Sequence, residues 1–403
     1  MKRILFVDDE SNVLDGLQRM LRPMRHEWEM VFVRSGAEAL VALAEQRFDV
    51  MVSDMRMPGM NGAQLMAEVM NIQPQAVRII LSGYSDQELI LKSAGLVHQY
   101  LAKPCQAEEV KLIVARACAL RDLLADERLK QLVSQVKSLP SPPSIYTELL
   151  KEMDSLDASI RKIGEVISRD VGMTAKVLQL VNSAFFGIRR HVGSPAEAIS
   201  LLGLDTVMKL TLIIHVFTQF DRKLLPEFSP DALISHSLRV GLFAKRIAQT
   251  ETVDSETIND AFSGGLLHDV GRLVMVVNLP QQYVRMRELA ESGIPSDDAE
   301  REAFGATHSE VGAYLLGLWG LPKSIIEAVA FHHRPGRCMA GGFSPMTAVH
   351  AANAIEHELQ ASPDRGAEPQ ATFDMDYLSE LGLVDRISVW REVCARVADE
   401  EPA

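Results

Sequence analysis

The stretch ILFVDDE occupies residues 4–10 of the 403-residue chain, and VMVSD occupies residues 50–54. In both stretches a short apolar run ends in acidic residues. Similar apolar runs lie at 30–33, 79–81 and 100–101, and the segments between them show helical spacing. Five short strands that alternate with helices predict βα units and a doubly wound, five-stranded parallel sheet that is covered on both faces.

The polar residues of this first half follow the strands. Asp8 and Asp9 follow the first strand, Asp54 ends the third, and Ser82 and Lys103 follow at the ends of the fourth and fifth. Parallel strands end at one edge of a sheet, so we expect these side chains to converge there. Neighbouring carboxylates need a cation, and Mg²⁺ prefers such oxygen ligands. The pattern therefore predicts a site for a phosphoryl group on Asp54.

Over residues 1–120 the sequence resembles the receiver domain of two-component response regulators. The matching stretches are FVDDE (6–10), VSDMRMPGMNG (52–62), LSGY (81–84) and YLAKP (100–104). The resemblance implies a flavodoxin-like fold in which Asp54 takes a phosphoryl group from a histidine kinase or a phosphotransfer protein.

The same resemblance implies roles for the residues around Asp54. Mg²⁺ would be held by Asp54 itself, by Asp9 directly, by Asp8 through water and by the backbone carbonyl of Arg56. Of the remaining residues, Lys103 would pair with the phosphoryl group and Ser82 would move to hydrogen-bond it. Tyr100 would then swing inward and alter the face formed by the fourth helix and the fifth strand.

Residues 108–139 contain no glycine or proline, and their apolar residues follow heptad spacing with a break near Arg128. We expect one long helix over 108–138 that joins the two halves of the chain. Two alternatives remain open for it: a signalling helix that pairs with its twin in a homodimer, or an extension that packs on its own domain. Prolines at 140, 142 and 143 mark the end of the segment.

From about residue 145 to 360 the periodicity is helical throughout, which predicts an all-α half. Its histidines and one carboxylate are typical ligands for Mn, Fe or Zn. A bound ion of this kind can activate a water molecule for phosphoester hydrolysis. The set, with the amide that follows it, is His236, His268, Asp269, His308, His332, His333 and Asn353.

LLHDVGR (266–272) resembles the HD superfamily of metal-dependent phosphohydrolases, and residues 130–360 resemble its HDOD output domain. The HDOD resemblance rests on LPSPPSIYTELL (139–150), ISRDVGMTAKVLQLVNSAFFG (167–187) and HSEVGAYLLGLWGLP (308–322). It implies that His236, His268 and Asp269 match the first three ligands of the HD pattern. His308, His332 and His333 match the additional histidines of the related HD-GYP pattern.

The sequence departs from the catalytic pattern at several positions. Asn353 stands where HD enzymes place the closing aspartate, Ala232 where HD-GYP enzymes place a glutamate, and Arg272 replaces a lysine. The Gly-Tyr-Pro signature is also absent after His333, and a site with fewer carboxylates should bind metal more weakly. We therefore favour a non-enzymatic module that binds a downstream signalling protein. A metal-dependent phosphohydrolase and a nucleotide-binding sensor are the alternatives.

Composition limits the partners. The 41 Lys and Arg residues against 54 Asp and Glu residues give a net charge of −13, so we expect no DNA binding. No apolar run approaches the roughly 20 residues that cross a bilayer, and the four cysteines form no close pair, which is typical of a cytoplasmic protein. The expected domains are a receiver (1–120), a helical linker (121–138), an HDOD domain (139–360) and a C-terminal extension (361–403).

Overall fold

The structure is a computed structural model. It describes residues 1–83, 95–120, 126–136, 159–182, 191–203, 228–338, 341–360 and 372–400, with the shorter pieces 148–149 and 151–152 and the single residues Leu89, Ser93 and Leu124. Tyr84 of the LSGY motif, the prolines at 140, 142 and 143, and residues 121–123, 125 and 137–138 of the expected linker lie outside these ranges.

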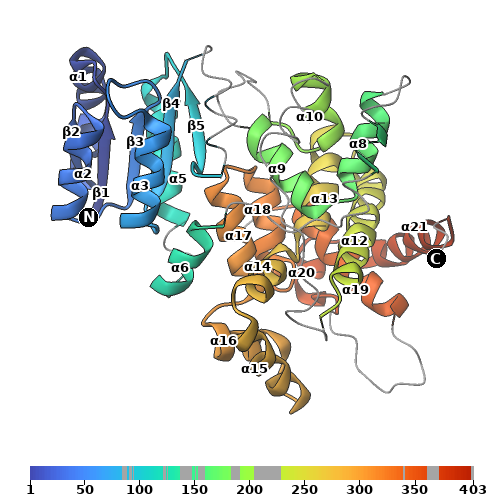
Figure 1. Cartoon of the computed structure of the whole chain (residues 1–403). Helices are drawn as coiled ribbons and strands as arrows, with labels where there is room; N and C mark the ends of the chain where they lie inside the picture. The colour runs from blue at the N-terminus through green and yellow to red at the C-terminus, as the bar shows by residue number, and fades with distance from the viewer. Residues whose placement is uncertain are drawn as a thin grey trace.

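The first half is a five-stranded, wholly parallel sheet in the order β2-β1-β3-β4-β5, with helices on its faces (Figure 1). This order confirms the predicted doubly wound fold. Its elements are β1 (Lys2–Val7), α1 (Ser11–Met20), η1 (Arg22–His26), β2 (Trp28–Val33), α2 (Gly36–Glu45), β3 (Val50–Asp54), α3 (Gly62–Ile72), β4 (Val77–Ser82), β5 (Gln99–Ala102) and α5 (Ala107–Leu120).

The strand register brings the polar strand ends to one edge. Asp54 at the end of β3 is paired with Leu81, and Ser82 at the end of β4 is paired with Ala102. The start of α3 lies directly against the end of β3. A Cβ atom at Gly62, the first residue of α3, would lie only 2.2 Å from the Asp54 carbonyl oxygen. Glycine at that position lets α3 start against the site.

The single helix expected over 108–138 is two helices in the structure. Helix α5 ends at Leu120, and α6 (Glu127–Ser134) starts after Asp126, whose backbone is extended. The Asp126 carboxylate accepts hydrogen bonds from the amides of Arg128 (2.7 Å) and Leu129 (3.1 Å). This N-cap satisfies two amides that begin a new helix, which explains the break in the heptad pattern. Helix α6 packs on the protein's own second half, and the homodimer through this segment stays a prediction.

Every described element of the second half is a helix, which confirms the all-α prediction. These are α8 (Ile160–Ser168), α9 (Val171–Val181), α10 (Pro195–Leu202), α12 (Pro230–Glu251), α13 (Ser255–Leu267), α14 (Val270–Asn278), α15 (Pro280–Glu291), α16 (Ser296–Phe304), α17 (His308–Leu318), α18 (Lys323–Phe331), η4 (Pro335–Arg337), α19 (Pro345–Gln360), α20 (Met375–Glu380), η6 (Val384–Arg386) and α21 (Ile387–Glu400). None of the helices in the described part of the chain has the length and apolar character needed to cross a membrane.

The two halves share an apolar core. Val114 of α5, Val133 of α6 and Leu315 of α17 belong to one buried cluster that also reaches into the sheet. Figure 1 shows β5 at the side of the sheet that faces the helical half. Helix α17 lies at this junction, since it contacts α5 and α6 as well as α14 and α18.

Candidate functional sites

The first site lies at the carboxyl edge of the sheet and is built around Lys103. The Lys103 Nζ atom lies 2.7 Å from Asp8 Oδ2 and also forms an ion pair with Asp54 Oδ1. Asp8 and Asp54 are both buried, and the Arg56 amide donates a hydrogen bond of 2.8 Å to Asp54 Oδ2. Asp9 follows Asp8 and is half-buried. The structure therefore brings Asp8, Asp54 and Lys103 together, whereas the place of Asp9 in this pocket and the roles of all the members stay predictions.

The charges of this site depend on one another. Burial raises the pKa of Asp54 above its ordinary value, and the Asp8 carboxylate adds to the effect while Lys103 opposes it. Burial would lower the pKa of Lys103, but its contacts with Asp54 and Asp8 outweigh burial and raise that pKa. The ammonium group therefore stays charged and acts as the cation that two buried carboxylates require.

The two expected switch residues differ in their surroundings. Ser82 is buried, and its hydroxyl oxygen has no hydrogen-bond partner among the described residues. Tyr100 is also buried, and its hydroxyl is hydrogen-bonded to Ser93 Oγ at 2.9 Å. Tyr100 thus points inward in this structure, and its role as a switch stays a prediction.

The donor set at this edge suits Mg²⁺. Asp8 and Asp54 present carboxylate oxygens, which are hard ligands for a small divalent cation, and the half-buried Asp9 follows Asp8 in the chain. The Ser82 hydroxyl, which has no partner among the described residues, lies at the end of the neighbouring strand and leaves a donor for a further oxygen ligand such as a phosphoryl group.

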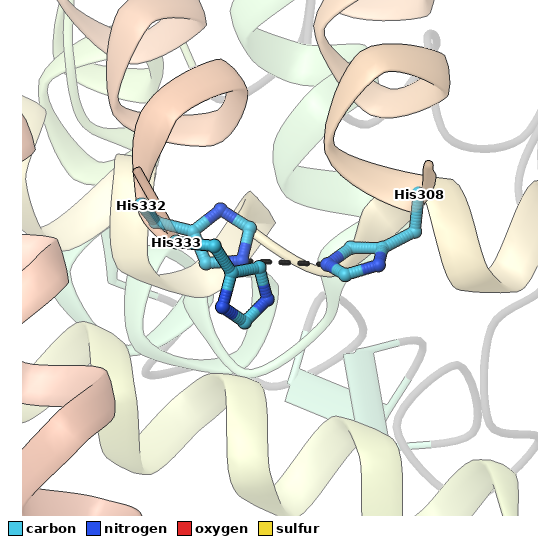
Figure 2. A group of neighbouring side chains, drawn as sticks. All are labelled: His308, His332 and His333. Atoms are coloured by element: carbon cyan, nitrogen blue, oxygen red, sulfur yellow. Dashed lines mark hydrogen bonds between the residues drawn. The ribbon is translucent and has the colours of Figure 1, made fainter. Parts of the chain in front are cut away.

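The second site is a cluster of histidines inside the helical half. It gathers the predicted histidines and Asp269, and Figure 2 shows His308, His332 and His333 directed at one another. His236 comes from α12, His268 and Asp269 from the α13–α14 junction, His308 from the start of α17, and His332 and His333 directly follow α18. Asn353 lies on α19, which packs against α12, α13 and α18.

The histidine rings are oriented from outside the cluster. His268 and His332 each place Nδ1 against the backbone carbonyl oxygen three residues earlier, at 2.6 and 2.8 Å, so Nδ1 carries the proton and donates it. The Nε2 atoms point inward: His268 Nε2 lies 3.2 Å from His236 Nε2, and His332 Nε2 lies 3.4 Å from His308 Nε2. In neutral rings these atoms carry lone pairs that repel one another. A proton or a metal cation between them relieves that repulsion.

Two glutamates that the sequence analysis missed complete this arrangement. Glu356 Oε2 lies 2.7 Å from His236 Nδ1, and its other oxygen accepts from Arg239 at 2.7 Å. Glu300 accepts from His308 Nδ1 at 2.8 Å and from the His308 amide at 2.8 Å. A carboxylate on the outer nitrogen fixes the ring and increases the basicity of the inner one. His357, also missed, contributes to a neighbouring trio with His236 and Glu356.

Asp269 lies at the centre of the cluster. Its Oδ1 atom is 3.1 Å from His308 Nε2 and 3.2 Å from Arg272 Nε. The geometry of these two ion pairs does not meet the requirements of a hydrogen bond. Burial opposes ionisation, but Arg272 and the histidines hold the pKa of Asp269 well below its usual value. Asn353 is buried, and its Oδ1 atom has no hydrogen-bond partner among the described residues. Such an unpaired oxygen is costly unless a further group binds it.

Electrostatics keeps most of the cluster neutral. Burial lowers the pKa of His268 to about 4 and that of His333 to about 2, and it also lowers the pKa of His332. His308 is the exception: burial would lower its pKa, but Glu300 and Asp269 raise it to about 9. Neutral imidazoles are metal ligands, and the proton on His308 is the one that a cation would displace. The residues therefore fit a transition-metal ion such as Mn, Fe or Zn.

A cavity of about 520 Å³ opens beside the cluster and is lined by both Asp269 and His236. Arg239 and Arg272 also line it, and each is paired with a carboxylate. The remaining wall is mixed: polar residues such as Ser235, Glu300 and Gln360 lie alongside the apolar Phe228, Leu233, Met275, Tyr283, Met286 and Phe304. A second cavity of about 270 Å³ borders His332 and His333. The two cavities share Arg272, Ser296 and His357, so they adjoin each other beside the cluster.

Comparison with known families agrees with this division into two parts. The model of the response regulator receiver domain matches residues 4–115, and that of the HDOD domain matches residues 139–335. This chain is a response regulator with an HDOD domain. It therefore belongs to two-component signalling, as the sequence motifs predicted.

Curated relatives of this response regulator match parts of it. An uncharacterized protein of Treponema pallidum is 29% identical over 208 residues, which are 50% of this chain and 39% of the relative. The uncharacterized transcriptional regulatory protein YesN of Bacillus subtilis is 27% identical over 196 residues, 40% of this chain and 52% of the relative. This chain thus spans less than two thirds of the length of either relative.

Two solved structures cover more of the response regulator. The MmoQ response regulator of Methylococcus capsulatus is 27% identical, with a TM-score of 0.45 over 60% of this chain and 98% of that one. A virulence factor of Campylobacter jejuni is 21% identical, with a TM-score of 0.48 over 63% of this chain and 94% of that one.

Proposed function

We propose that Asp54 accepts a phosphoryl group from a histidine kinase or a phosphotransfer protein. We further propose that this event controls a non-catalytic HDOD module that binds a downstream signalling protein. The observation that carries the first proposal is the position of Lys103, whose ammonium group bridges the buried carboxylates of Asp8 and Asp54. The net charge of −13 favours a protein partner over DNA for the second.

The residues at this edge can perform the transfer. An Asp54 carboxylate oxygen attacks the phosphorus atom, and the bond from phosphorus to the donor's histidine nitrogen breaks, which leaves an acyl phosphate on Asp54. Lys103 then pairs with the phosphoryl oxygens, and the Ser82 hydroxyl donates a hydrogen bond to one of them. Bound Mg²⁺, held by Asp8, Asp9, Asp54 and the Arg56 carbonyl, would supply positive charge to the same oxygens.

Labelling with acetyl phosphate tests this proposal. Wild-type protein with Mg²⁺ should gain one phosphoryl group by intact-mass measurement, and Asp54→Asn should gain none. Asp15→Asn is the matched control, because Asp15 is an exposed aspartate on α1 away from the strand ends. Labelling of Asp54→Asn at the wild-type level would overturn the assignment.

The histidine cluster favours a second candidate function, a metal-binding site that acts as a sensor or a phosphohydrolase. It is supported by the inward Nε2 atoms of four rings, from His236, His268, His308 and His332. Asn353 in place of an aspartate argues against hydrolysis, because a neutral amide oxygen offsets none of the charge of a multinuclear site.

Metal content decides whether the second candidate stands. Protein purified without chelator under low oxygen should hold about one Mn, Fe or Zn per chain. We expect Asp269→Ala and His332→Ala to lose this metal and His26→Ala to keep it, because His26 is exposed in η1. Equal metal in all four proteins, or none in the wild type, would remove the metal-site function and leave the binding module.

A further inference from the structure

A receiver side chain contacts the carboxyl end of α17. The side-chain amide of Gln99 in β5 donates to the carbonyl oxygens of Gly317 (3.3 Å) and Leu318 (3.2 Å). Carbonyls in the last turn of a helix have no partner within the helix, so Gln99 caps α17 from the other domain. Gln99 is itself buried.

The surrounding backbone is shaped to admit this contact. Gly320 has φ +72°, and a Cβ atom there would lie 3.2 Å from Gln99 Cδ. Glycine therefore permits both the left-handed turn after α17 and the approach of Gln99. From α9, the Gln179 side-chain amide donates to the His98 carbonyl oxygen at 3.1 Å. The HDOD domain thus holds two consecutive receiver residues at the start of β5.

The same strand leads directly to the phosphorylation site. Tyr100 follows Gln99, and Lys103 follows the last residue of β5. Ser82 is paired with Ala102 across the β4–β5 ladder. The residue that caps α17 therefore lies in the same short strand as Tyr100, four positions before Lys103.

The other end of α17 is part of the histidine cluster. His308 is the first residue of the helix, and its Nε2 atom lies 3.1 Å from Asp269 Oδ1. All residues of α17 except Glu310 are buried. A Cβ atom at Gly271 would lie 1.9 Å from the His308 carbonyl oxygen, so α14 and α17 are in backbone contact. A close-packed helix of 11 residues is about 16 Å long, and dense packing of this kind transmits displacements between its ends.

We propose that α17 couples the two sites, so that phosphorylation of Asp54 shifts β5 and α17 and changes the affinity of the histidine cluster for a divalent cation. This inference rests on both candidate functions above. A shift of one or two ångströms at a helix interface is a known scale for such transitions, and it would move His308 relative to Asp269. Coupling is reciprocal, so a cation at His308 must in turn change the environment of β5.

Calorimetric titration with Mn²⁺ tests the coupling in the full chain, with and without beryllium fluoride as a phosphoryl mimic, in a buffer whose excess Mg²⁺ occupies the receiver site. We expect the mimic to change the wild-type Kd at least about fivefold. Gln99→Ala should reduce that change to less than about twofold while keeping its basal Kd and its labelling by acetyl phosphate. Gln131→Ala, an exposed glutamine of α6, is the matched control and should behave as the wild type. An unchanged Kd in a wild type that is labelled and binds Mn²⁺ would overturn the coupling.

Hydrogen exchange separates failure of the coupling from failure of either site. If Mn²⁺ does not bind, beryllium fluoride should still alter exchange of the α17 amides, and Gln99→Ala should abolish this effect. If Asp54 is not labelled, Mn²⁺ should still alter exchange of the β5 amides. Unaltered amide exchange in whichever of these two experiments can be performed would overturn the coupling. If neither site binds its ligand, the coupling fails together with the proposed function.

Discussion

Asp8 Oδ2 lies 2.7 Å from Lys103 Nζ, although the two residues are 95 positions apart in the chain. The parallel sheet brings them together because β1 and β5 end at the same edge. The contact makes Lys103 the cation of the acidic pocket until Mg²⁺ or a phosphoryl group arrives.

This relationship predicts that Lys103 competes with Mg²⁺. Lys103→Met should bind Mg²⁺ more tightly, on the order of tenfold, because a positive charge leaves the pocket. The same variant should be labelled more slowly by acetyl phosphate, because the phosphoryl oxygens lose their partner. Calorimetry and intact-mass kinetics measure the two effects. Lys111→Met, at a more exposed lysine of α5, should change neither value. Weaker Mg²⁺ binding by Lys103→Met would contradict the competition.

Asn353→Asp should strengthen metal binding in the histidine cluster. The substitution adds a carboxylate where a buried amide oxygen has no partner among the described residues, so metal affinity should rise on the order of tenfold. In the absence of metal the same change should lower the thermal midpoint, because it buries another negative charge. Asn278→Asp, at an exposed position, is the control. A variant with unchanged Mn²⁺ affinity would place Asn353 outside the metal site.

Glu356→Gln tests the orientation of His236. The amide keeps the size of the side chain but removes the charge that holds the outer nitrogen of the ring, so metal affinity should fall roughly 10–100-fold. Glu358→Gln is a matched control, since Glu358 lies two residues later and pairs with Arg391 instead. Calorimetric titration with Mn²⁺ compares the two. Equal affinities would show that Glu356 has no influence on the metal.

Gly320→Ala should lower the free energy of unfolding by about 1 to 2 kcal/mol, the cost of a left-handed backbone for a residue with a Cβ atom. It should also weaken the cap that Gln99 places on α17. Gly16→Ala in α1 should be neutral or stabilising, because nothing lies within 4 Å of the added Cβ atom. The thermal midpoints of the two variants test this prediction. Equal midpoints would contradict the expected destabilisation by Gly320→Ala.

The buried Lys176 predicts a pH dependence of stability. Burial lowers its pKa to about 7, although its ammonium lies 5.1 Å from the Trp319 ring centre. From about pH 7 to 10 the unfolded chain binds a proton at this lysine that the folded chain does not. The free energy of unfolding should therefore increase with pH in that window. Lys176→Met should remove this contribution and raise the thermal midpoint more at pH 7 than at pH 9.5, on the order of 3 °C.

A comparison with Lys162→Met separates this effect from general charge removal, because Lys162 is largely exposed. The difference between each variant and the wild type is the quantity to compare at the two pH values. A Lys176→Met difference that is the same at both would contradict the assignment.

The sheet and the polar residues at the carboxyl ends of its strands could be predicted from the sequence. Apolar runs that end in Asp8 and Asp54 predict strand ends, and parallel strands leave little freedom in where those ends meet. The break at Asp126 was harder to foresee, because an aspartate in a helical pattern is recognised as an N-cap only when its backbone is extended. A heptad irregularity near Arg128 was the available signal.

The contacts between distant segments could not be predicted in this way. Glu300 and Gln99 are ordinary surface-type residues in the sequence, and their roles come from helices and strands that meet only in the folded chain. Glu356 had a weak signal, since it lies three residues after Asn353 and so on the same side of α19. Long-range packing decides such contacts, and local periodicity does not contain it.

The assignment of Asp54 is tested most directly by locating the phosphoryl group. Protein labelled with acetyl phosphate is treated with borohydride, which reduces an aspartyl phosphate to homoserine, and the modified peptide is sequenced by mass spectrometry. We predict homoserine at position 54, and none in unlabelled protein or in Asp54→Asn. Homoserine at Asp8 or Asp9 instead, or at no position in a labelled wild type, would contradict the proposed phosphorylation site.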